Sequence, residues 1–228
     1  MKNSFLHRIA FIIIPIVTVI GTSAQSKQQD TATHIIQLPI NYSKERIDLS
    51  IEYLKTRHGI TQSTPTINPK MIVLHFTGFG TIKTIHEYFN APTIEESRQI
   101  NKKVSALNVG SHYLIDRDGS IYQLIPDTLL ARHVIGLNYC AIGVENIGSE
   151  KEPLTEAQTI SNAKLVRHLS SKFKIEYLIG HEEYIKFRNS DIWKETDSKY
   201  ITIKNDPGKS FMEGVRNLTK DLNLKSTP

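Results

Sequence analysis

Three short apolar runs constrain the fold of this chain more than any other feature of its sequence. They are "KMIVLHF" (70–76), "YCAIGVENIG" (139–148) and "IEYLIG" (175–180). Each run is short for a core helix and rich in β-branched or aromatic residues, so each predicts a buried strand. Segments with helical patterns separate these runs, and that alternation is typical of proteins that combine strands and helices in one core.

Four segments carry helix signals. Apolar residues recur at helical spacing in 43–57, and capping boxes begin helices at Thr93 and Thr155. The segment "FMEGVRNLTKDL" (211–222) predicts a closing helix. Asp118-Gly119 joins two further β-rich runs and is a strong hairpin signal. Together these elements predict an α/β fold: a single domain with a central mixed β-sheet flanked by helices.

The N-terminus has the order of a secretory signal peptide. Residues 1–24 begin with the basic Lys2 and Arg8, continue with an apolar run and end in small residues, with cleavage expected after Ala24. The alternative is an uncleaved membrane anchor, although the apolar run is short for a membrane span. We therefore expect an exported protein, periplasmic or secreted, with no stable membrane span after cleavage.

The rest of the chain divides into an N-terminal extension (25–42) and one domain (43–223), which contains an insertion-like loop at 184–202. Removal of residues 1–24 leaves a net charge of +3, which suits an anionic polymer such as a cell wall and is too weak to indicate nucleic-acid binding. The single cysteine, Cys140, excludes an internal disulfide. It lies in an apolar run, which favours a buried structural thiol over a nucleophile.

Two histidines stand at the C-terminal ends of predicted strands: His75 in "IVLHF" and His181 in "YLIGH". Such strand ends carry the functional sites of α/β folds. One histidine there is more often structural, but two with a downstream carboxylate indicate a metal, because catalytic zinc takes three such ligands and keeps one open position. The pairs His86-Glu87 and His181-Glu182 lack the second histidine of H-E-x-x-H, which excludes that protease motif.

Six fragments occur along the chain in a recognisable order: "IVLHFT", "SHYLIDRDGSIYQLIPD", "ARH", "AIGVENIG", "LIGHEE" and "KNDPGKSF". In this order they resemble the zinc-dependent N-acetylmuramoyl-L-alanine amidases of type 2, which are related to peptidoglycan-recognition proteins and phage amidases. The resemblance covers about residues 68–215. It implies that Zn²⁺ is bound by His75, His181 and Asp206, and that Glu145 and Lys204 match the family's two catalytic positions.

The chemistry of the last two residues agrees with such roles. Glu145 places a carboxylate inside an apolar strand, which is costly unless the group is paired or used, a structural salt bridge being the alternative. As a base and then an acid, it can take a proton from water and pass it to a leaving amine. Lys204 and Asp206 would share one face of an extended segment, where the cation can stabilise a tetrahedral intermediate.

One position and one spacing depart from the family pattern. Phe76 stands where the family often has a second histidine that is not a ligand. His181 and Asp206 are 25 positions apart, which is longer than usual. The segment between them can form a lid, a groove wall or a plain surface loop. It offers Asp191 and Asp197 as rival ligands, although only Asp206 has the matching K-x-D-P-G context.

The resemblance implies hydrolysis of the amide bond between N-acetylmuramic acid and L-alanine of the peptidoglycan stem peptide, by metal-activated water. One alternative is a module that recognises the same fragment without turnover, and another is a zinc peptidase that cuts within the stem peptide. His133 in "ARHVIG" is a candidate substrate contact, whereas we expect His112 in "SHYLI" to be structural. Expected partners are peptidoglycan or muropeptide fragments and no nucleic acid, and the chain is expected to be a monomer.

Overall fold

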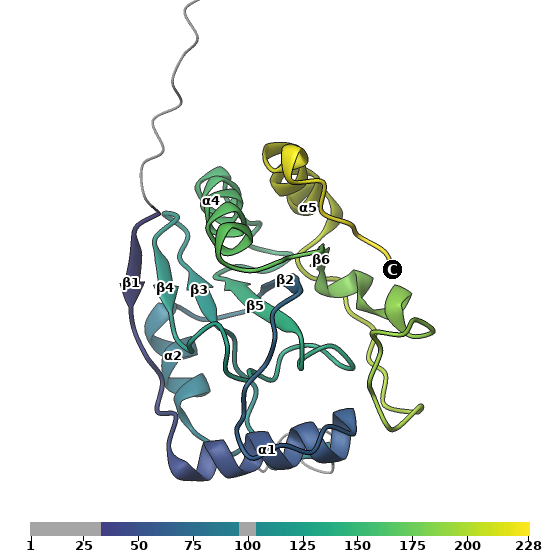
Figure 1. Cartoon of the computed structure of the whole chain (residues 1–228). Coiled ribbons are helices and arrows are strands. Elements are labelled where there is room, and N and C mark those ends of the chain that lie inside the picture. Colours follow the sequence, from purple (N-terminus) through teal and green to yellow (C-terminus); the bar gives the residue numbers. More distant parts are fainter. Residues whose placement is uncertain (1–32, 96–103) are drawn as a thin grey trace, which may run out of the picture. The chain divides into compact units, whose positions relative to one another are not determined.

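The computed structural model describes residues 33–95 and 104–228, which are organised around a six-stranded sheet (Figure 1). The strands lie in the order β1-β4-β3-β5-β2-β6, and every neighbouring pair is parallel except the antiparallel pair β3–β4. The predicted α/β fold with a central mixed sheet is confirmed. The strands are β1 (Ile35–Gln37), β2 (Met71–Phe76), β3 (Tyr113–Ile115), β4 (Ile121–Gln123), β5 (Ala141–Asn146) and β6 (Tyr177–Gly180).

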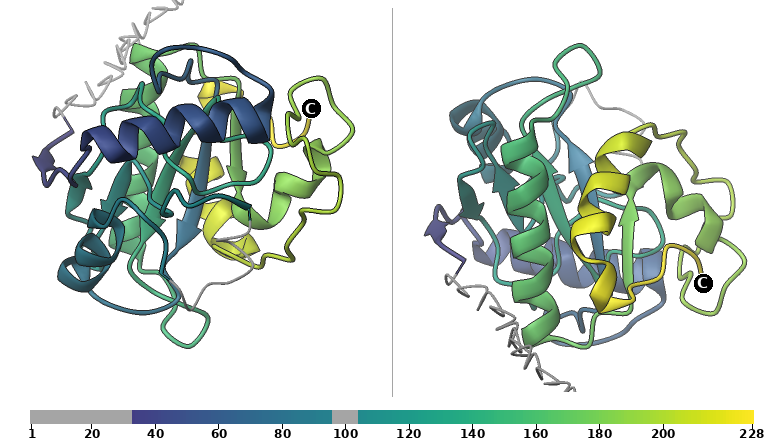
Figure 2. Two further views of the ribbon diagram at one scale, coloured as in Figure 1. Left: turned by 90° about the horizontal axis from the view of Figure 1, so that it is seen from below. Right: turned by 90° about the horizontal axis from the view of Figure 1, so that it is seen from above.

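Helices cover both faces of the sheet. Figure 2 shows α1 across one face, and α4 and α5 next to each other on the opposite face. Apolar side chains of α4 and α5 share one buried cluster with alternate residues of β2 and β5. The helices are α1 (Lys44–His58), α2 (Ile82–Asn90), α4 (Glu156–Lys172) and α5 (Lys209–Leu218), with the short 3₁₀ helices η1 (His181–Phe187) and η2 (Lys220–Leu222).

Local signals in the sequence account for most of these elements. Ser43 caps α1, and Thr155 and Gln158 form the capping box predicted for α4. The predicted hairpin joins β3 to β4, and its turn is closed where Gly119 N–H donates to the carbonyl of Asp116 over 2.9 Å. The sequence patterns do not predict α2, because its capping box has threonine at the third helical position instead of glutamate or glutamine.

The sheet begins before the predicted domain boundary at residue 43. Ile35 in β1 is in parallel register with Ile121 in β4, so part of the predicted 25–42 extension belongs to the sheet. The predicted signal peptide, 1–24, lies outside the described residues, as does most of the helix predicted in 93–103. Among the described residues, no helix is long and apolar enough to cross a bilayer.

The pleat of the two central strands decides which side chains point to the same side. Ile72 and Leu74 of β2 face α4 and α5, so His75 faces the opposite side of the sheet. Glu145 of β5 is the register partner of His75 in a parallel pair, and its neighbour Val144 also packs with α4 and α5. His75 and Glu145 therefore project from the same face, at the edge where the parallel strands end.

The insertion-like segment at 184–202 packs against the rest of the protein. Its ends are joined by the Tyr184 hydroxyl, which donates to the Thr202 carbonyl over 2.6 Å and accepts from the Thr202 N–H over 2.9 Å. Tyr184 is buried and stacks on Trp193. The Trp193 ring in turn lies against Gly136, where an added Cβ would be 2.6 Å from the ring.

A second set of contacts joins this segment to the end of α1. The Thr196 N–H donates to the carbonyl of Arg57 over 3.0 Å, and the Thr196 hydroxyl donates to the carbonyl of Thr56 over 2.7 Å. The Arg57 guanidinium also pairs with the carboxylate of Glu195 at 2.5 Å. The segment is therefore a brace between α1 and the sheet, and this packing does not suit a freely moving lid.

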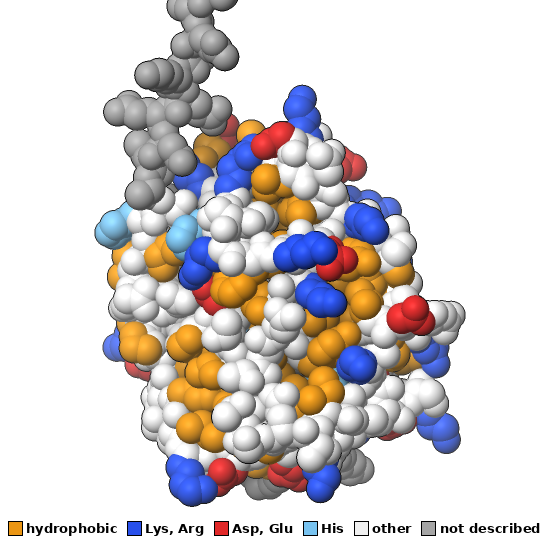
Figure 3. Space-filling model, in the orientation of Figure 1, with side chains coloured by type: hydrophobic (Ala, Val, Ile, Leu, Met, Phe, Trp, Pro, Cys, Tyr) orange, Lys and Arg blue, Asp and Glu red, His pale blue; other side chains and the backbone are white. Residues whose placement is uncertain are grey.

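Charged side chains of both signs are mixed on one face of the molecule (Figure 3). On the face shown in Figure 3, Lys and Arg stand among acidic, apolar and uncharged side chains and do not form one continuous basic patch.

Cys140 is buried, as predicted, and burial raises the pKa of its thiol to about 11. A thiol with so high a pKa is a poor nucleophile at neutral pH.

Candidate metal centre

The candidate site lies where three neighbouring parallel strands end. β2 lies between β5 and β6, and Leu74 of β2 is in register with Gly180, the last residue of β6. His75 therefore follows Leu74 on one strand, and His181 follows Gly180 on the next. Parallel strands bring their carboxyl ends to one edge, so two histidines 106 positions apart in the sequence become neighbours.

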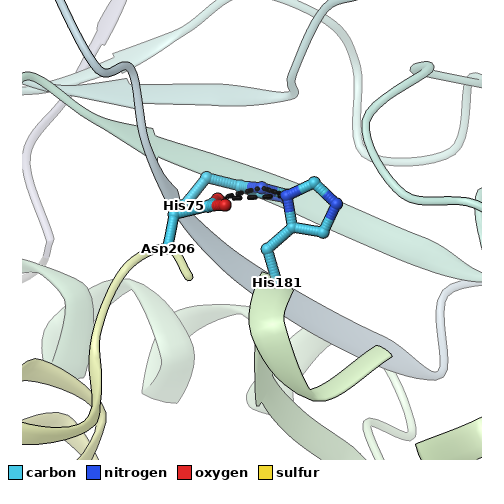
Figure 4. A group of neighbouring side chains, drawn as sticks. All are labelled: His75, His181 and Asp206. Carbon is cyan, nitrogen blue, oxygen red and sulfur yellow. Dashed lines mark hydrogen bonds and ion pairs between the residues drawn. The ribbon is translucent and has the colours of Figure 1, made fainter. Parts of the chain in front are cut away.

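Three buried side chains converge at this edge (Figure 4). His75 Nδ1 lies 2.9 Å from His181 Nδ1 and 3.2 Å from Asp206 Oδ2. His181 Nδ1 lies 3.0 Å from the same carboxylate oxygen. Within the described residues, this is the one group of three or more His, Cys, Asp or Glu side chains that could hold a metal ion.

The donor atoms suit a cation such as Zn²⁺. Two imidazole nitrogens and one carboxylate oxygen are ligands that zinc prefers, and bonds of about 2.0–2.1 Å in a tetrahedron place neighbouring ligand atoms about 3.3 Å apart. The observed separations of 2.9–3.2 Å are close to that value. One shared proton cannot satisfy three atoms that all point at each other, whereas a cation can.

The pKa values favour the metal-binding protonation states. Burial, together with His75 and Lys204, lowers the pKa of His181 to about 4, although Asp206 opposes this. Burial acts to raise the pKa of Asp206, but the hydrogen bonds and charges of His181 and His75 outweigh it and hold that pKa well below its usual range. A neutral imidazole beside an ionised carboxylate is the form that binds a metal.

Backbone contacts at the base of the insertion bring Asp206 to this site. The Glu182 N–H donates to the carbonyl of Asp206 over 2.9 Å, so the residue after His181 is bonded directly to the aspartate 24 positions later. Gly180 leaves room for Pro207, the residue after Asp206, because a Cβ on Gly180 would lie 2.9 Å from Pro207 Cδ. The residues before and after the brace are therefore in contact, and Asp206 reaches the site although the brace is long.

The rival carboxylates lie elsewhere. Asp191 and Asp197 are exposed, and neither belongs to the converging group. Asp197 Oδ2 lies 3.9 Å from Arg57, at the contact between the brace and α1.

Glu145 stands beside the converging group. Among the described residues, its buried Oε2 atom has no hydrogen-bond partner, and the structural salt bridge considered above is not formed. Burial raises the pKa of Glu145 to about 7, with Asp206 raising it and His75 and Lys204 lowering it. A carboxylate whose pKa lies near neutrality can exchange a proton at working pH.

Lys204 is exposed and lines a cavity of about 350 Å³ together with Glu145, His181 and Asp206. A second cavity of about 130 Å³ shares Lys204 and His181 with the first, and Tyr200 and Thr202 of the brace line it. Four of the five predicted ligand and catalytic residues thus line the first cavity, and His75 contacts two of them, His181 and Asp206. The brace adds to the wall of the second cavity, which the groove-wall interpretation of the insertion anticipates.

His133 contacts His75, and His112 lies next to His133. His75 Nε2 is 3.1 Å from His133 Nδ1, and His133 Nε2 is 3.2 Å from the carbonyl of Ala141. His112 Nδ1 accepts from the Gly143 N–H over 3.0 Å, and its Nε2 lies 2.9 Å from the carbonyl of Leu129. His112 is fully buried with both nitrogens bonded, in accord with the expected structural role.

The family model of N-acetylmuramoyl-L-alanine amidases matches residues 63–209, which span the three converging residues, Glu145 and Lys204. The chain belongs to this type 2 amidase family. No curated protein sequence matches the chain.

Solved structures share the amidase fold. The amidase LysC from Clostridium intestinale superposes with a TM-score of 0.50 at 23% identity, covering 84% of this chain and 99% of that one. Bumblebee PGRP-SA superposes with a TM-score of 0.52 at 15% identity, covering 86% and 99%. At such identities, both likenesses concern the fold.

The buried side-chain amides of Asn146, Gln158 and Asn162 form hydrogen bonds next to the amidase site. The sequence patterns do not single out these residues as parts of the site. The Asn146 side chain donates to the carbonyl of His75 over 3.0 Å and accepts from Asn162 of α4 over 2.7 Å. Gln158 donates to the carbonyls of Ile115 and Ile147 while it completes the capping box. These bonds attach α4 to the strand ends and so hold His75 in place. In the sequence, only the position of Asn146 could have indicated this role: it is a second polar residue, directly after Glu145, in a predicted apolar strand.

Proposed function

We propose that the protein is a zinc-dependent amidase that hydrolyses the bond between N-acetylmuramic acid and L-alanine of the peptidoglycan stem peptide. Family membership supports an amidase that acts on peptidoglycan. The observation that carries the finer proposal is the convergence of three buried donor atoms 2.9–3.2 Å apart. Beside them lies Glu145, whose buried Oε2 has no hydrogen-bond partner among the described residues.

In this proposal, His75, His181 and Asp206 hold Zn²⁺. When bound, zinc polarises the amide carbonyl and lowers the pKa of a water molecule toward neutrality. Three protein ligands leave one position open, as catalytic zinc sites do.

Glu145 is the proton carrier. Its ionised form accepts a proton from the attacking water, and its protonated form donates that proton to the nitrogen that leaves with the L-alanyl peptide. Burial raises the pKa of this carboxyl to about 7 in the metal-free protein, which makes its ionised form a stronger base toward the attacking water. The products are a carboxylic acid on the sugar and an amine on the peptide, with one water consumed and no covalent enzyme intermediate.

Lys204 supplies positive charge at the same cavity, where it can stabilise the oxygen that becomes negative in the tetrahedral intermediate. Because its side chain is exposed, it can adjust to the substrate as the cavity fills. The cavity of about 350 Å³ has the size of a small-molecule site, which suits the reacting part of a muropeptide.

Mass spectrometry of products from purified muropeptides tests this proposal. The expected products are free stem peptides that begin with L-alanine and sugars that end in the lactyl carboxylate. Peptides cut internally would indicate the zinc peptidase instead. Binding of muropeptides without any product would indicate a recognition module. The complete set of residues at the site favours the enzyme.

We also propose that the enzyme is exported. The signal-peptide pattern at 1–24 and the mildly basic charge suit a monomeric enzyme that meets peptidoglycan or its fragments in the periplasm or outside the cell.

A further inference from the structure

His133 lies between a proposed metal ligand and a backbone carbonyl, and both of its ring nitrogens are engaged. Nδ1 lies 3.1 Å from His75 Nε2, and Nε2 lies 3.2 Å from the Ala141 carbonyl. The rings of His75 and His133 are perpendicular, with centroids 5.1 Å apart. The His133 ring also borders the cavity, but a substrate contact through either nitrogen would have to break one of these bonds.

Hydrogen-bond polarity assigns the protons along this chain. A carbonyl oxygen only accepts, so His133 Nε2 carries the hydrogen and neutral His133 keeps a lone pair on Nδ1. His75 must then donate from Nε2, which leaves His75 Nδ1 without a hydrogen. That unprotonated nitrogen is the atom 2.9 Å from His181 and 3.2 Å from Asp206.

Packing keeps the His133 ring in this position. The ring lies on Gly143, where an added Cβ would be 2.7 Å from its Cγ and Cδ2 atoms. Its backbone N–H donates to Asn138 Oδ1 over 2.9 Å, and the Asn138 side chain donates to the hydroxyl of the fully buried Tyr53 over 3.2 Å. Both the ring and its backbone are therefore fixed by neighbours that do not reach the metal ligands.

We propose that His133 is a positioning residue that holds His75 in the Nε2–H tautomer, and so keeps Nδ1 of His75 free to bind the metal. This inference rests on the metal site of the proposed function. Outer partners of ligating histidines set the tautomer and ring orientation in this way, and their loss typically costs about 10- to 100-fold in metal affinity or activity. The role differs from the substrate contact expected from the sequence.

Four variants separate this role from general packing. His133→Phe keeps an aromatic ring and removes both bonds, whereas His133→Gln keeps one donor and one acceptor. Gly143→Ala adds a methyl group against the ring without touching a ligand, and its backbone does not need a positive φ. Gly110→Ala is the matched control, because the nearest atom to its added Cβ is 3.8 Å away.

The readouts are the zinc dissociation constant and the visible absorption spectrum of the cobalt-substituted protein. We expect His133→Phe and Gly143→Ala to weaken zinc binding by about 10- to 100-fold and to change the cobalt spectrum. We expect His133→Gln to recover most of the affinity and Gly110→Ala to match the wild type. Unchanged affinity and spectrum in both His133→Phe and Gly143→Ala would overturn the inference.

One further measurement needs no substitution, so it decides the question even if a variant fails to fold. NMR of the imidazole nitrogens in the metal-free wild type should show His75 protonated at Nε2, and protonation at Nδ1 would contradict the proposal. The outcomes also separate the two claims. If the variants lose zinc as expected but the wild type releases no stem peptide, the proposed reaction fails and the positioning role stands. If the wild type is active and the variants bind zinc normally, only the positioning role fails.

Discussion

Replacing Glu145 with glutamine should lower activity by orders of magnitude while making the metal-free protein more stable. The pKa of Glu145 rises from 4.5 to about 7, chiefly because the carboxylate is buried, and its Oε2 has no hydrogen-bond partner in the described part of the chain. Each unit of difference between the folded and unfolded chain corresponds to about 1.4 kcal/mol. The buried charge therefore costs about 3 kcal/mol of folding free energy once it is ionised.

The sign of the pH dependence follows from proton binding. Between pH 4.5 and about 7 the folded chain keeps a proton on Glu145 that the unfolded chain has released. Raising the pH through this window therefore favours unfolding, and the loss is complete above the folded pKa. Glutamine cannot ionise, so Glu145→Gln should match the wild type near pH 4.5 and exceed it by about 3 kcal/mol from pH 7 upward.

Urea unfolding of both proteins in a chelator, repeated from pH 4.5 to 8, measures this difference. Hydrolysis of muropeptides by the zinc-loaded variant should fall by about 10²- to 10⁴-fold while its zinc content stays stoichiometric. A stability difference that does not grow with pH would refute the argument from burial. A fully active variant would remove Glu145 from the chemistry.

Three other substitutions test separate parts of the structure. Asp206→Ala should lose zinc in metal analysis while Asp191→Ala retains it, and the reverse result would move the third ligand into the brace. Tyr184→Phe should lower the free energy of unfolding by about 1–3 kcal/mol in urea, because the N–H and carbonyl of Thr202 lose their shared partner; an unchanged value would mean that water replaces the hydroxyl. Burial lowers the pKa of His112 from 6.5 to about 4, so this residue should cost stability as the pH falls from 6.5 to 4, and His112→Gln should make the denaturation profile flatter over that range than in the wild type. An equally steep profile in the variant would show that His112 does not resist protonation.

Local pattern was sufficient for most of the fold. Buried strands, capping boxes and the Asp118-Gly119 turn each depend on a few adjacent residues, so the sequence predicts β2, β5, β6, α1, α4 and the hairpin. The sequence did not predict α2, because threonine, not glutamate or glutamine, completes its capping box. β1 is a three-residue strand whose identity depends on pairing with β4, and no local signal in 25–42 shows that pairing.

The site was predictable to the extent that strand ends show it. His75 and His181 follow apolar strands, so their approach could be anticipated from the parallel order of β2 and β6. Asp191 and Asp197 were rival ligands, but only Asp206 has the K-x-D-P-G context that matches the family. The sequence does not show how the chain returns to the site, because that depends on a long-range contact, the hydrogen bond from Glu182 N–H to the Asp206 carbonyl.

The arrangement around His133 was beyond the reach of sequence patterns. His133 and His75 are 58 positions apart, and their contact depends on the space that Gly143 leaves on β5. A glycine inside an apolar strand can mark a close approach, but nothing local shows which side chain approaches. The same holds for the brace, whose polar composition indicates a surface loop although Tyr184 and Phe187 are buried.

Removal and return of the metal tests the central claim most directly. The purified protein is dialysed against a strong chelator, and release of L-alanyl stem peptides from muropeptides is measured before and after zinc is added back. We predict that release stops when the metal is removed and returns in proportion to zinc, up to one ion per chain. Full-rate release from protein shown by metal analysis to be free of zinc would contradict the account.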